Sequence, residues 1–331
     1  MPPGNMLKGR GTNNHVVNTG DKKMRFLIVG PGAMGCLFAA RLKMAGFEVV
    51  LQDKHEERAL EINKKGIRVE GVTGEYRVKV RTNTGKPPLV PDVVLICVKS
   101  YDTLAAAQIL RPWIEPKARI LTLQNGVGNI EILQEIFDEQ RILGGVTAEG
   151  ATVLGPGSIR HAGQGETMIG PVNGPDNAVA KIVNAFNKAG FVTKAIEDVE
   201  NLIWGKLIIN VGINALAAIT GLKNGLLPKF SGTRIIMEQA VNEAVSVART
   251  KGITLPYSDP LGRVIEVCQA TSGNVASMLQ DVLNKKMTEI EFINGAIVRE
   301  GKARGIATPV NSTLTHLVKT LQETYAQRSI S

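Results

Sequence analysis

The sequence predicts an α/β domain followed by an all-helical domain, and three observations support this division. Short apolar strands alternate with helical patterns in the first part of the chain, and a glycine-rich turn joins the first strand to the first helix. From about Glu197 onward, apolar residues recur with the period of about 3.6 that is typical of helices. We therefore expect domains at residues 24–196 and 197–331, preceded by a tail over residues 1–23.

The composition excludes several protein classes. Hydrophobic residues make up 44% of the 331 residues and the mean hydropathy is +0.03, which is ordinary for a globular protein with room for two cores. No run approaches the roughly 18 uncharged apolar residues of a membrane span, so we expect no membrane partner. Three widely spaced cysteines give no disulfide or metal-binding framework, so we expect no metal site and a cytoplasmic location.

The net charge of +9 is distributed in a way that argues against nucleic-acid binding. The tail contributes +3 of it and leaves +6 for the two domains. Because the tail is rich in glycine and asparagine and lacks an apolar core, we expect it to be disordered and not to be a secretory signal. Nucleic-acid binding favours clustered cations with interleaved aromatics, and aromatic residues make up only 4%. The excess charge therefore suits small anionic ligands.

The first strand and helix carry a dinucleotide-binding fingerprint. Residues 26–29 form an apolar strand, a helical pattern runs to Gly46, and a second strand begins at Glu48. The turn has the G-x-G-x-x-G spacing and consists of Gly30, Pro31, Gly32, Ala33, Met34 and Gly35. In such a turn the first glycine permits the tight bend, the second lets a pyrophosphate approach, and the third packs the helix on the strand. The helix N-terminus binds the phosphates, so we expect a Rossmann-type domain.

The choice between NADPH and NADH stays open at the end of the second strand. A carboxylate at this position usually binds the ribose 2′-hydroxyl of NADH, whereas a cation accommodates the 2′-phosphate of NADPH. The sequence supplies both, because Lys54 directly follows Asp53, with His55 and Arg58 just beyond.

Two further strand ends are candidates for cofactor contact. Strands at 93–98 and 119–123 are followed by Lys99 and by Asn125, and ligands lie beyond the carboxyl ends of parallel strands. A solvated loop lysine and a plain Asn-Gly turn are the alternatives. Residues 141–170 show alternating strands with a turn at 155–157, and we expect them to continue the sheet in antiparallel fashion.

The second half predicts an all-helical domain, and a cleft between it and the first domain would be a usual place for a substrate. Glycine and proline clusters separate the expected helices, which lie near 197–220, 232–251, 258–270, 274–304 (interrupted) and 311–327.

The first of these helices is apolar nearly all round, so we expect it to be buried. Lys206, Asn210 and Asn214 follow one another at steps of four residues, each of which advances about 40° around a helix. They therefore form one polar stripe, and buried polar groups are costly unless they have partners. Either another segment satisfies them or a polar ligand does, and a ligand would be an anionic or carbonyl compound with Lys206 as its cation and proton donor.

Two polar clusters occur later in the chain. Ser277 and Asp281 lie in the first, and Glu289 lies in the second. A helix N-cap, a first-turn acid and a solvated helix face are the ordinary alternatives to a functional role.

Together these segments resemble the ketopantoate reductase family (2-dehydropantoate 2-reductases) from Met24 to about Leu321. The resemblance rests on six motifs in order: Gly30-Pro31-Gly32-Ala33-Met34-Gly35, Val98-Lys99-Ser100, Gln124-Asn125-Gly126, Trp204-x-Lys206-Leu207-x-x-Asn210-x-x-x-Asn214, Ser277-Met278-x-x-Asp281 and Thr288-Glu289-Ile290-x-x-Ile293-Asn294-Gly295.

The resemblance implies hydride transfer from NADPH to the C2 ketone of ketopantoate, a 2-keto acid, giving D-pantoate for pantothenate and coenzyme A synthesis. It implies that Lys206 protonates the carbonyl oxygen and that Glu289 orients Lys206. It assigns substrate binding to Asn210, Asn214, Asn224 and Ser277, and cofactor binding to the glycine-rich turn, Asp53, Lys54, Lys99, Asn125 and Ala151. It also permits a homodimer.

Two departures from the family pattern bear on specificity. Glu149 stands where the family commonly has a histidine near the nicotinamide, which would alter the ketone that fits. Asp53 precedes the position of the family's 2′-phosphate-binding arginine, filled here by Lys54, and would favour NADH. The alternatives are therefore an NAD(P)-dependent D-2-hydroxyacid dehydrogenase for another branched or aromatic 2-keto acid, and a non-catalytic dinucleotide-binding sensor.

Overall fold

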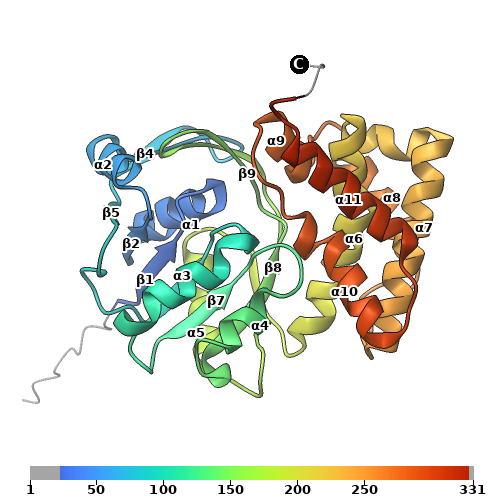
Figure 1. Ribbon diagram of the computed structural model, residues 1–331. Helices are drawn as coiled ribbons and strands as arrows, with labels where there is room; N and C mark the ends of the chain where they lie inside the picture. The colour runs from blue at the N-terminus through green and yellow to red at the C-terminus, as the bar shows by residue number, and fades with distance from the viewer. Residues whose placement is uncertain (1–22, 328–331) are drawn as a thin grey trace, which may run out of the picture.

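A computed structural model describes residues 23–327 of the chain. The disorder predicted for the tail therefore falls, apart from Lys23, outside the described residues. Figure 1 shows a sheet-containing half, coloured blue to green, beside an all-helical half coloured yellow to red. This arrangement confirms the predicted fold class.

Within residues 23–327 the larger sheet has eight strands in the order β12-β11-β8-β7-β6-β1-β2-β5. Neighbouring strands are parallel except β8 and β11, which pair antiparallel. The strands are β1 (Arg25–Val29), β2 (Glu48–Gln52), β5 (Arg81–Asn83), β6 (Val93–Ile96), β7 (Arg119–Thr122), β8 (Ile142–Thr147), β11 (Thr167–Pro171) and β12 (Thr193–Ala195).

Helices cover both faces of this sheet. Along β1, Phe26 and Ile28 pack into one core cluster, whereas Leu27 and Val29 pack into another. A strand buried on both faces is apolar at every position, which explains the unbroken apolar run. The first cluster includes α1 (Ala33–Met44) and α5 (Ala178–Lys188), and the second includes α3 (Thr103–Leu110) and α4 (Asn129–Gln134). The remaining helix of this half is α2 (Glu56–Lys65), and short 3₁₀ turns are η1 (Ser100–Asp102), η2 (Arg111–Trp113) and η3 (Glu139–Arg141).

The antiparallel continuation predicted for 141–170 is correct only for the pairing of β8 with β11. Strand β8 is parallel to β7, and the hairpin between β8 and β11 leaves the sheet altogether. In the described part of the chain it forms a four-stranded sheet in the order β4-β3-β10-β9, made of β3 (Ile67–Gly71), β4 (Tyr76–Val78), β9 (Gly150–Gly155) and β10 (Ser158–Gly163). The alternating pattern of the sequence indicated the hairpin, but it could not indicate that the hairpin pairs with β3, which lies far upstream. The small sheet packs on α1.

The second half consists of helices around a central one, α6, which contacts α7, α8, α9 and α11. The interrupted segment predicted at 274–304 divides into α9, a 3₁₀ turn and α10. The elements are α6 (Val199–Thr220), η4 (Asn224–Lys229), α7 (Ser231–Thr250), α8 (Pro260–Ala270), α9 (Ser277–Leu283), η5 (Ile290–Phe292), α10 (Asn294–Arg304) and α11 (Pro309–Glu323).

Helix α6 is buried as its sequence predicts. By length and composition it would be able to cross a membrane, but 67% of its most apolar window lies inside the bundle, and a core helix passes the same test. The side chain of Asp198 caps its N-terminus and Gly221 ends it in the left-handed conformation, at φ +72°. Gly212 lets α8 approach closely, because a Cβ there would lie 2.8 Å from Val264 Cγ1.

Candidate active site

The glycine-rich turn has the geometry of a pyrophosphate cradle. Gly30 adopts φ +103°, and a Cβ on Gly35 would lie 2.0 Å from the Gly30 carbonyl oxygen. At Gly32, by contrast, an added Cβ would have no atom of the described residues within 4 Å apart from those of its immediate chain neighbours. No side chain of residues 23–327 caps the N-terminus of α1, and its first turn has no acidic residue. The turn is therefore rigid where helix meets strand and open where an anion would approach, which fits a dinucleotide.

At the end of β2 the carboxylate of Asp53 is hydrogen-bonded to Arg58. Its side chain is 0% exposed and bonds Arg58 through two contacts, Nε–Oδ2 at 2.6 Å and Nη2–Oδ1 at 2.5 Å. Burial alone would raise the pKa of Asp53, but the Arg58 guanidinium and the His55 amide hold that pKa below its usual range. Beside this pair, the exposed Lys54 bonds Asp102 at 3.0 Å. Two partly exposed cations, each paired with a carboxylate, therefore lie at this strand end.

Glu289 connects the helical half to the end of β6. Its Oε1 accepts hydrogen bonds from the Ser100 amide and the Ser100 hydroxyl, both at 2.9 Å. The Ser100 hydroxyl also lies 3.1 Å from the carbonyl oxygen of Asn125, and Asn129 Nδ2 donates to the same two oxygens. The loop after β7 meets the helical half as well, since Val127 N donates to Phe292 O at 2.9 Å. Ends of two neighbouring strands are thereby joined to η5.

Lys99 lies between two carboxylates of the helical half. Its Nζ is 2.6 Å from Asp281 Oδ2 and 3.4 Å from Glu289 Oε2. Burial alone would lower the pKa of Lys99, but Glu289 and Asp281 outweigh it and raise that pKa above its ordinary value. Lys99 is therefore a fixed cation at the end of β6, and the alternative of a freely solvated loop lysine is wrong.

Lys206 differs from Lys99 because burial outweighs the nearby carboxylate and lowers its pKa. Its Nζ donates a hydrogen bond to the Thr147 carbonyl oxygen at 2.8 Å, so α6 is linked here to the end of β8. Burial lowers the pKa of the Lys206 ammonium to about 8, although the nearby Glu289 carboxylate opposes the shift. An amine that titrates near neutral pH is suited to donate a proton.

The asparagines of the polar stripe follow Lys206 along α6. Asn214 is buried, and the buried Nδ2 of Asn210 has no hydrogen-bond partner within residues 23–327. Asn224, at the start of η4, donates to Thr271 Oγ1 at 2.9 Å, while its buried Oδ1 has no partner in the same described range. Ser277 is the exposed first residue of α9. Protein partners thus leave two buried amide groups of the predicted substrate set unsatisfied.

Two family models match the chain. "Ketopantoate reductase PanE/ApbA" covers residues 26–174, and "Ketopantoate reductase PanE/ApbA C terminal" covers residues 198–322. The chain belongs to the ketopantoate reductase family. This finding confirms the resemblance deduced from the six motifs.

Relatives of the family align over nearly their whole length. The 2-dehydropantoate 2-reductase of Halobacterium salinarum is 36% identical, covering 90% of this chain and 99% of the relative. A ketopantoate reductase family structure from Ralstonia eutropha JMP134 superposes with a TM-score of 0.84 at 34% identity, covering 91% and 99% of the two chains. A D-mandelate dehydrogenase with NADH and anilino(oxo)acetate superposes with a TM-score of 0.85 at 28% identity and the same coverage.

In this ketopantoate reductase family chain, some polar contacts of the site could not be predicted from the sequence. Asn129 had no signal, Ser100 appeared only within the Val98-Lys99-Ser100 motif, and Arg58 appeared only as a cation beyond Asp53. The fold places Arg58 against Asp53, Ser100 against Glu289, and Asn129 against Ser100. Asp281 was identified from the sequence only as a member of a polar cluster and of a family motif. A pattern cannot reveal such partners, because each pair except Asp53 and Arg58 is far apart in sequence.

The remaining predicted residues lie beside the small sheet. Ala151 is on β9, opposite His161 in the register of β10. Glu149 does not present its charge to a ligand, because its carboxylate is buried against His161. The expectation that Glu149 alters which ketone fits stays a prediction, and any such effect would act through the His161 pair.

Proposed function

We propose that the chain reduces 2-dehydropantoate to D-pantoate with NADPH, which supplies the hydride for C2. The observation that carries the proposal is the Lys206 ammonium, which is hydrogen-bonded to the Thr147 carbonyl oxygen, feels the charge of Glu289 and has a pKa of about 8. Hydride addition to a ketone leaves charge on oxygen, and a cation at that oxygen stabilises the transition state. Lys206 donates the proton that completes the alcohol.

The polar residues around Lys206 bind the rest of the substrate in this proposal. The unpartnered Nδ2 of Asn210 is a donor for a hydroxyl or carboxylate oxygen, and the unpartnered Oδ1 of Asn224 is an acceptor for a hydroxyl. Asn214 and Ser277 complete the set, and Lys99 and Asn125 serve the cofactor with the glycine-rich turn. Glu289 orients Lys206 and also holds the loop after β6 through Ser100.

Steady-state rates with a panel of keto acids test the proposal. Ketopantoate, 2-ketoisovalerate and benzoylformate are each assayed with NADPH and with NADH. We expect ketopantoate with NADPH to have the highest kcat/KM. A preference for benzoylformate with NADH would favour an activity like that of the D-mandelate dehydrogenase with the similar fold. Tight NADPH binding without turnover of any keto acid would favour a sensor.

The preference for NADPH is supported by the charges at the end of β2. The Asp53 carboxylate, which would repel a 2′-phosphate, is buried and paired with Arg58, while Lys54 and part of Arg58 stay exposed. The possibility of NADH left open by Asp53 is therefore less favoured than NADPH. In this proposal Asp53 holds the Arg58 guanidinium in place.

Replacing Arg58 with alanine tests this assignment. We expect kcat/KM for NADPH to fall about 10- to 100-fold, since a hydrogen bond to a charged group is worth roughly 1.5–3 kcal/mol, whereas the value for NADH changes less than about threefold. The matched control is Lys65→Gln, which removes an exposed cation at the other end of α2. Equal losses with both cofactors would contradict a 2′-phosphate role.

The pH dependence tests the assignment of Lys206 as the acid. The acid must be protonated, so kcat/KM for keto-acid reduction should be constant below about pH 8 and fall about tenfold per pH unit above it. In the reverse direction the neutral amine is required, and the rate should rise through the same pH. An alkaline limb near 10.5, the ordinary lysine value, would show that another group controls the reaction.

Three wider features of the proposal come from the sequence. The boundary between residues 196 and 197 agrees with β12 ending at Ala195 and the second family model beginning at residue 198. A cytoplasmic location and a homodimer without nucleic-acid or membrane partners stay predictions. Size-exclusion chromatography with light scattering would test the dimer.

A further inference from the structure

We propose that the buried pair of Glu149 and His161 is a positioning device for Lys206, because it fixes the short connection between β8 and β9, at which the Thr147 carbonyl accepts a hydrogen bond from the lysine. The inference rests on the proposed role of Lys206 as the proton donor. It assigns a function to two ionisable residues that the proposed chemistry does not use.

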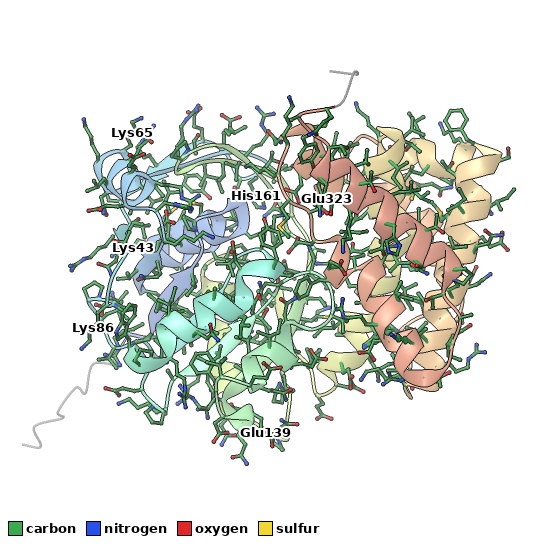
Figure 2. All side chains as sticks on the ribbon, viewed as in Figure 1. Lys43, Lys65, Lys86, Glu139, His161 and Glu323 are labelled. Carbon is green, nitrogen blue, oxygen red and sulfur yellow. The ribbon has the colours of Figure 1, made fainter. Side chains whose placement is uncertain are left out.

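The pair is buried and fully engaged. Glu149 Oε2 and His161 Nε2 are 2.6 Å apart, and the two side chains are 1% and 0% exposed. The other ring nitrogen, Nδ1, is 2.9 Å from Thr73 Oγ1 in the turn between β3 and β4. With partners on both nitrogens the imidazole has one orientation, and removal of either pair member leaves a buried polar group without its partner. Figure 2 labels His161 near the middle of the view, between the two halves of the chain.

The connection between β8 and β9 carries both Glu149 and the Thr147 carbonyl that accepts the Lys206 hydrogen bond. Thr147 ends β8, Glu149 follows two residues later, and Gly150 begins β9. Glu149 N is 3.2 Å from Thr147 Oγ1, which is itself 2.8 Å from Thr167 Oγ1. The Thr147 carbonyl, between these contacts, accepts the Lys206 bond at 2.8 Å. Loss of the carboxylate anchor would therefore loosen the backbone that holds the ammonium.

The chain changes sheets at this connection, where the Ala148 amide donates to the Glu166 carbonyl oxygen and Glu149 supplies a second attachment. Residues 148 and 149 belong to neither sheet, although β8 lies in the large one and β9 in the small one. Glu149 is tied through His161 to β10, which pairs with both β9 and β3. The pair thus attaches the connection between β8 and β9 to the small sheet, while Lys206 of α6 bonds the Thr147 carbonyl at the start of that connection. The charged group that acts on Lys206 is Glu289, which approaches from the segment before η5.

Two variants of different severity test the inference. Glu149→Ala breaks the pair, and Thr73→Val removes only the outer partner of His161 at a position that is not fully buried. The control is Arg160→Gln, which breaks an exposed ion pair with Glu70 on the residue next to His161. Each protein is assayed for kcat and for KM with NADPH, for the pH profile of kcat/KM, and for its melting temperature.

We expect Glu149→Ala to lower kcat roughly 10- to 100-fold by misplacing the acid, with KM for NADPH within about twofold. The alkaline limb should move to lower pH by roughly half a unit to one unit, because a hydrogen-bond acceptor favours the charged amine. Thr73→Val should move it in the same direction by less, and Arg160→Gln should not move it. If Glu149→Ala does not fold, Thr73→Val decides.

A wild-type pH profile in every folded pair variant would overturn the inference, and so would a change that appears only in the melting temperature. Failure of the proposed function looks different. In that case Lys206→Ala itself would leave kcat unchanged, whereas failure of the positioning role alone leaves the Lys206→Ala loss intact.

Discussion

Replacing Lys206 with alanine should lower kcat for keto-acid reduction about 10²- to 10⁴-fold, the range that general acid catalysis contributes. The substitution removes both the proton and the charge that stabilises the developing alkoxide. The KM for NADPH should change little, because the residues proposed to bind its pyrophosphate belong to the glycine-rich turn and α1, whereas Lys206 belongs to α6. Initial rates of NADPH consumption at saturating keto acid measure the effect.

The control for this experiment is Lys302→Ala, which removes an exposed lysine of α10. It should keep wild-type kcat, and circular dichroism should show both variants to be folded. A Lys206→Ala enzyme with unchanged kcat would refute the acid role. A large rise in KM for NADPH without a fall in kcat would indicate instead that Lys206 binds the cofactor.

Replacing Glu289 with alanine should lower kcat/KM about 10- to 100-fold. Its carboxylate bonds the amide and hydroxyl of Ser100 and lies 3.4 Å from Lys99 Nζ. Hydrogen bonds to a charged group are worth roughly 1.5–3 kcal/mol, and the loss leaves the buried Ser100 amide without this acceptor, whereas the Ser100 hydroxyl keeps the Asn125 carbonyl oxygen. The assay is the same steady-state measurement at saturating NADPH.

Glu289→Gln separates the charge of Glu289 from its shape. The amide oxygen of glutamine still accepts from Ser100, but the negative charge that opposes the lowered pKa of Lys206 is gone. The alkaline limb of kcat/KM should therefore lie below the position of about pH 8 that is expected for the wild type. Glu291→Gln is the matched control, because Glu291 is half-exposed and pairs with Lys319 outside the site. An unmoved limb in Glu289→Gln would mean that Glu289 does not act on Lys206.

The sequence predicts the conformation of the glycine-rich turn well because its determinants are local. Gly30, Gly32 and Gly35 act within one strand-turn-helix unit, and their roles follow from spacing alone. The same holds for α6, whose apolar surroundings and four-residue polar steps determine that Lys206, Asn210 and Asn214 share one side of a buried helix.

The partners of these residues could not be predicted in the same way. Lys206 is bonded to Thr147 and Glu289 is bonded to Ser100, and the members of each pair lie on different domains. A backbone carbonyl such as that of Thr147 has no signature in a sequence, since every residue has one. The prediction for residues 141–170 was wrong in part for a related reason, because a hairpin pattern does not specify which sheet edge it joins.

By itself, the sequence determined the order of the two domains, the glycine-rich turn, the buried helix with its polar stripe, and the family. These features depend on residue type and short spacing, which set backbone freedom and helix faces. Only the tertiary structure decided which charges are available. It pairs the Asp53 carboxylate with Arg58, keeps Lys99 charged between two carboxylates, and lowers the pKa of Lys206 to about 8 by burial. Charge depends on distance and on burial, and both arise only when separate segments pack together.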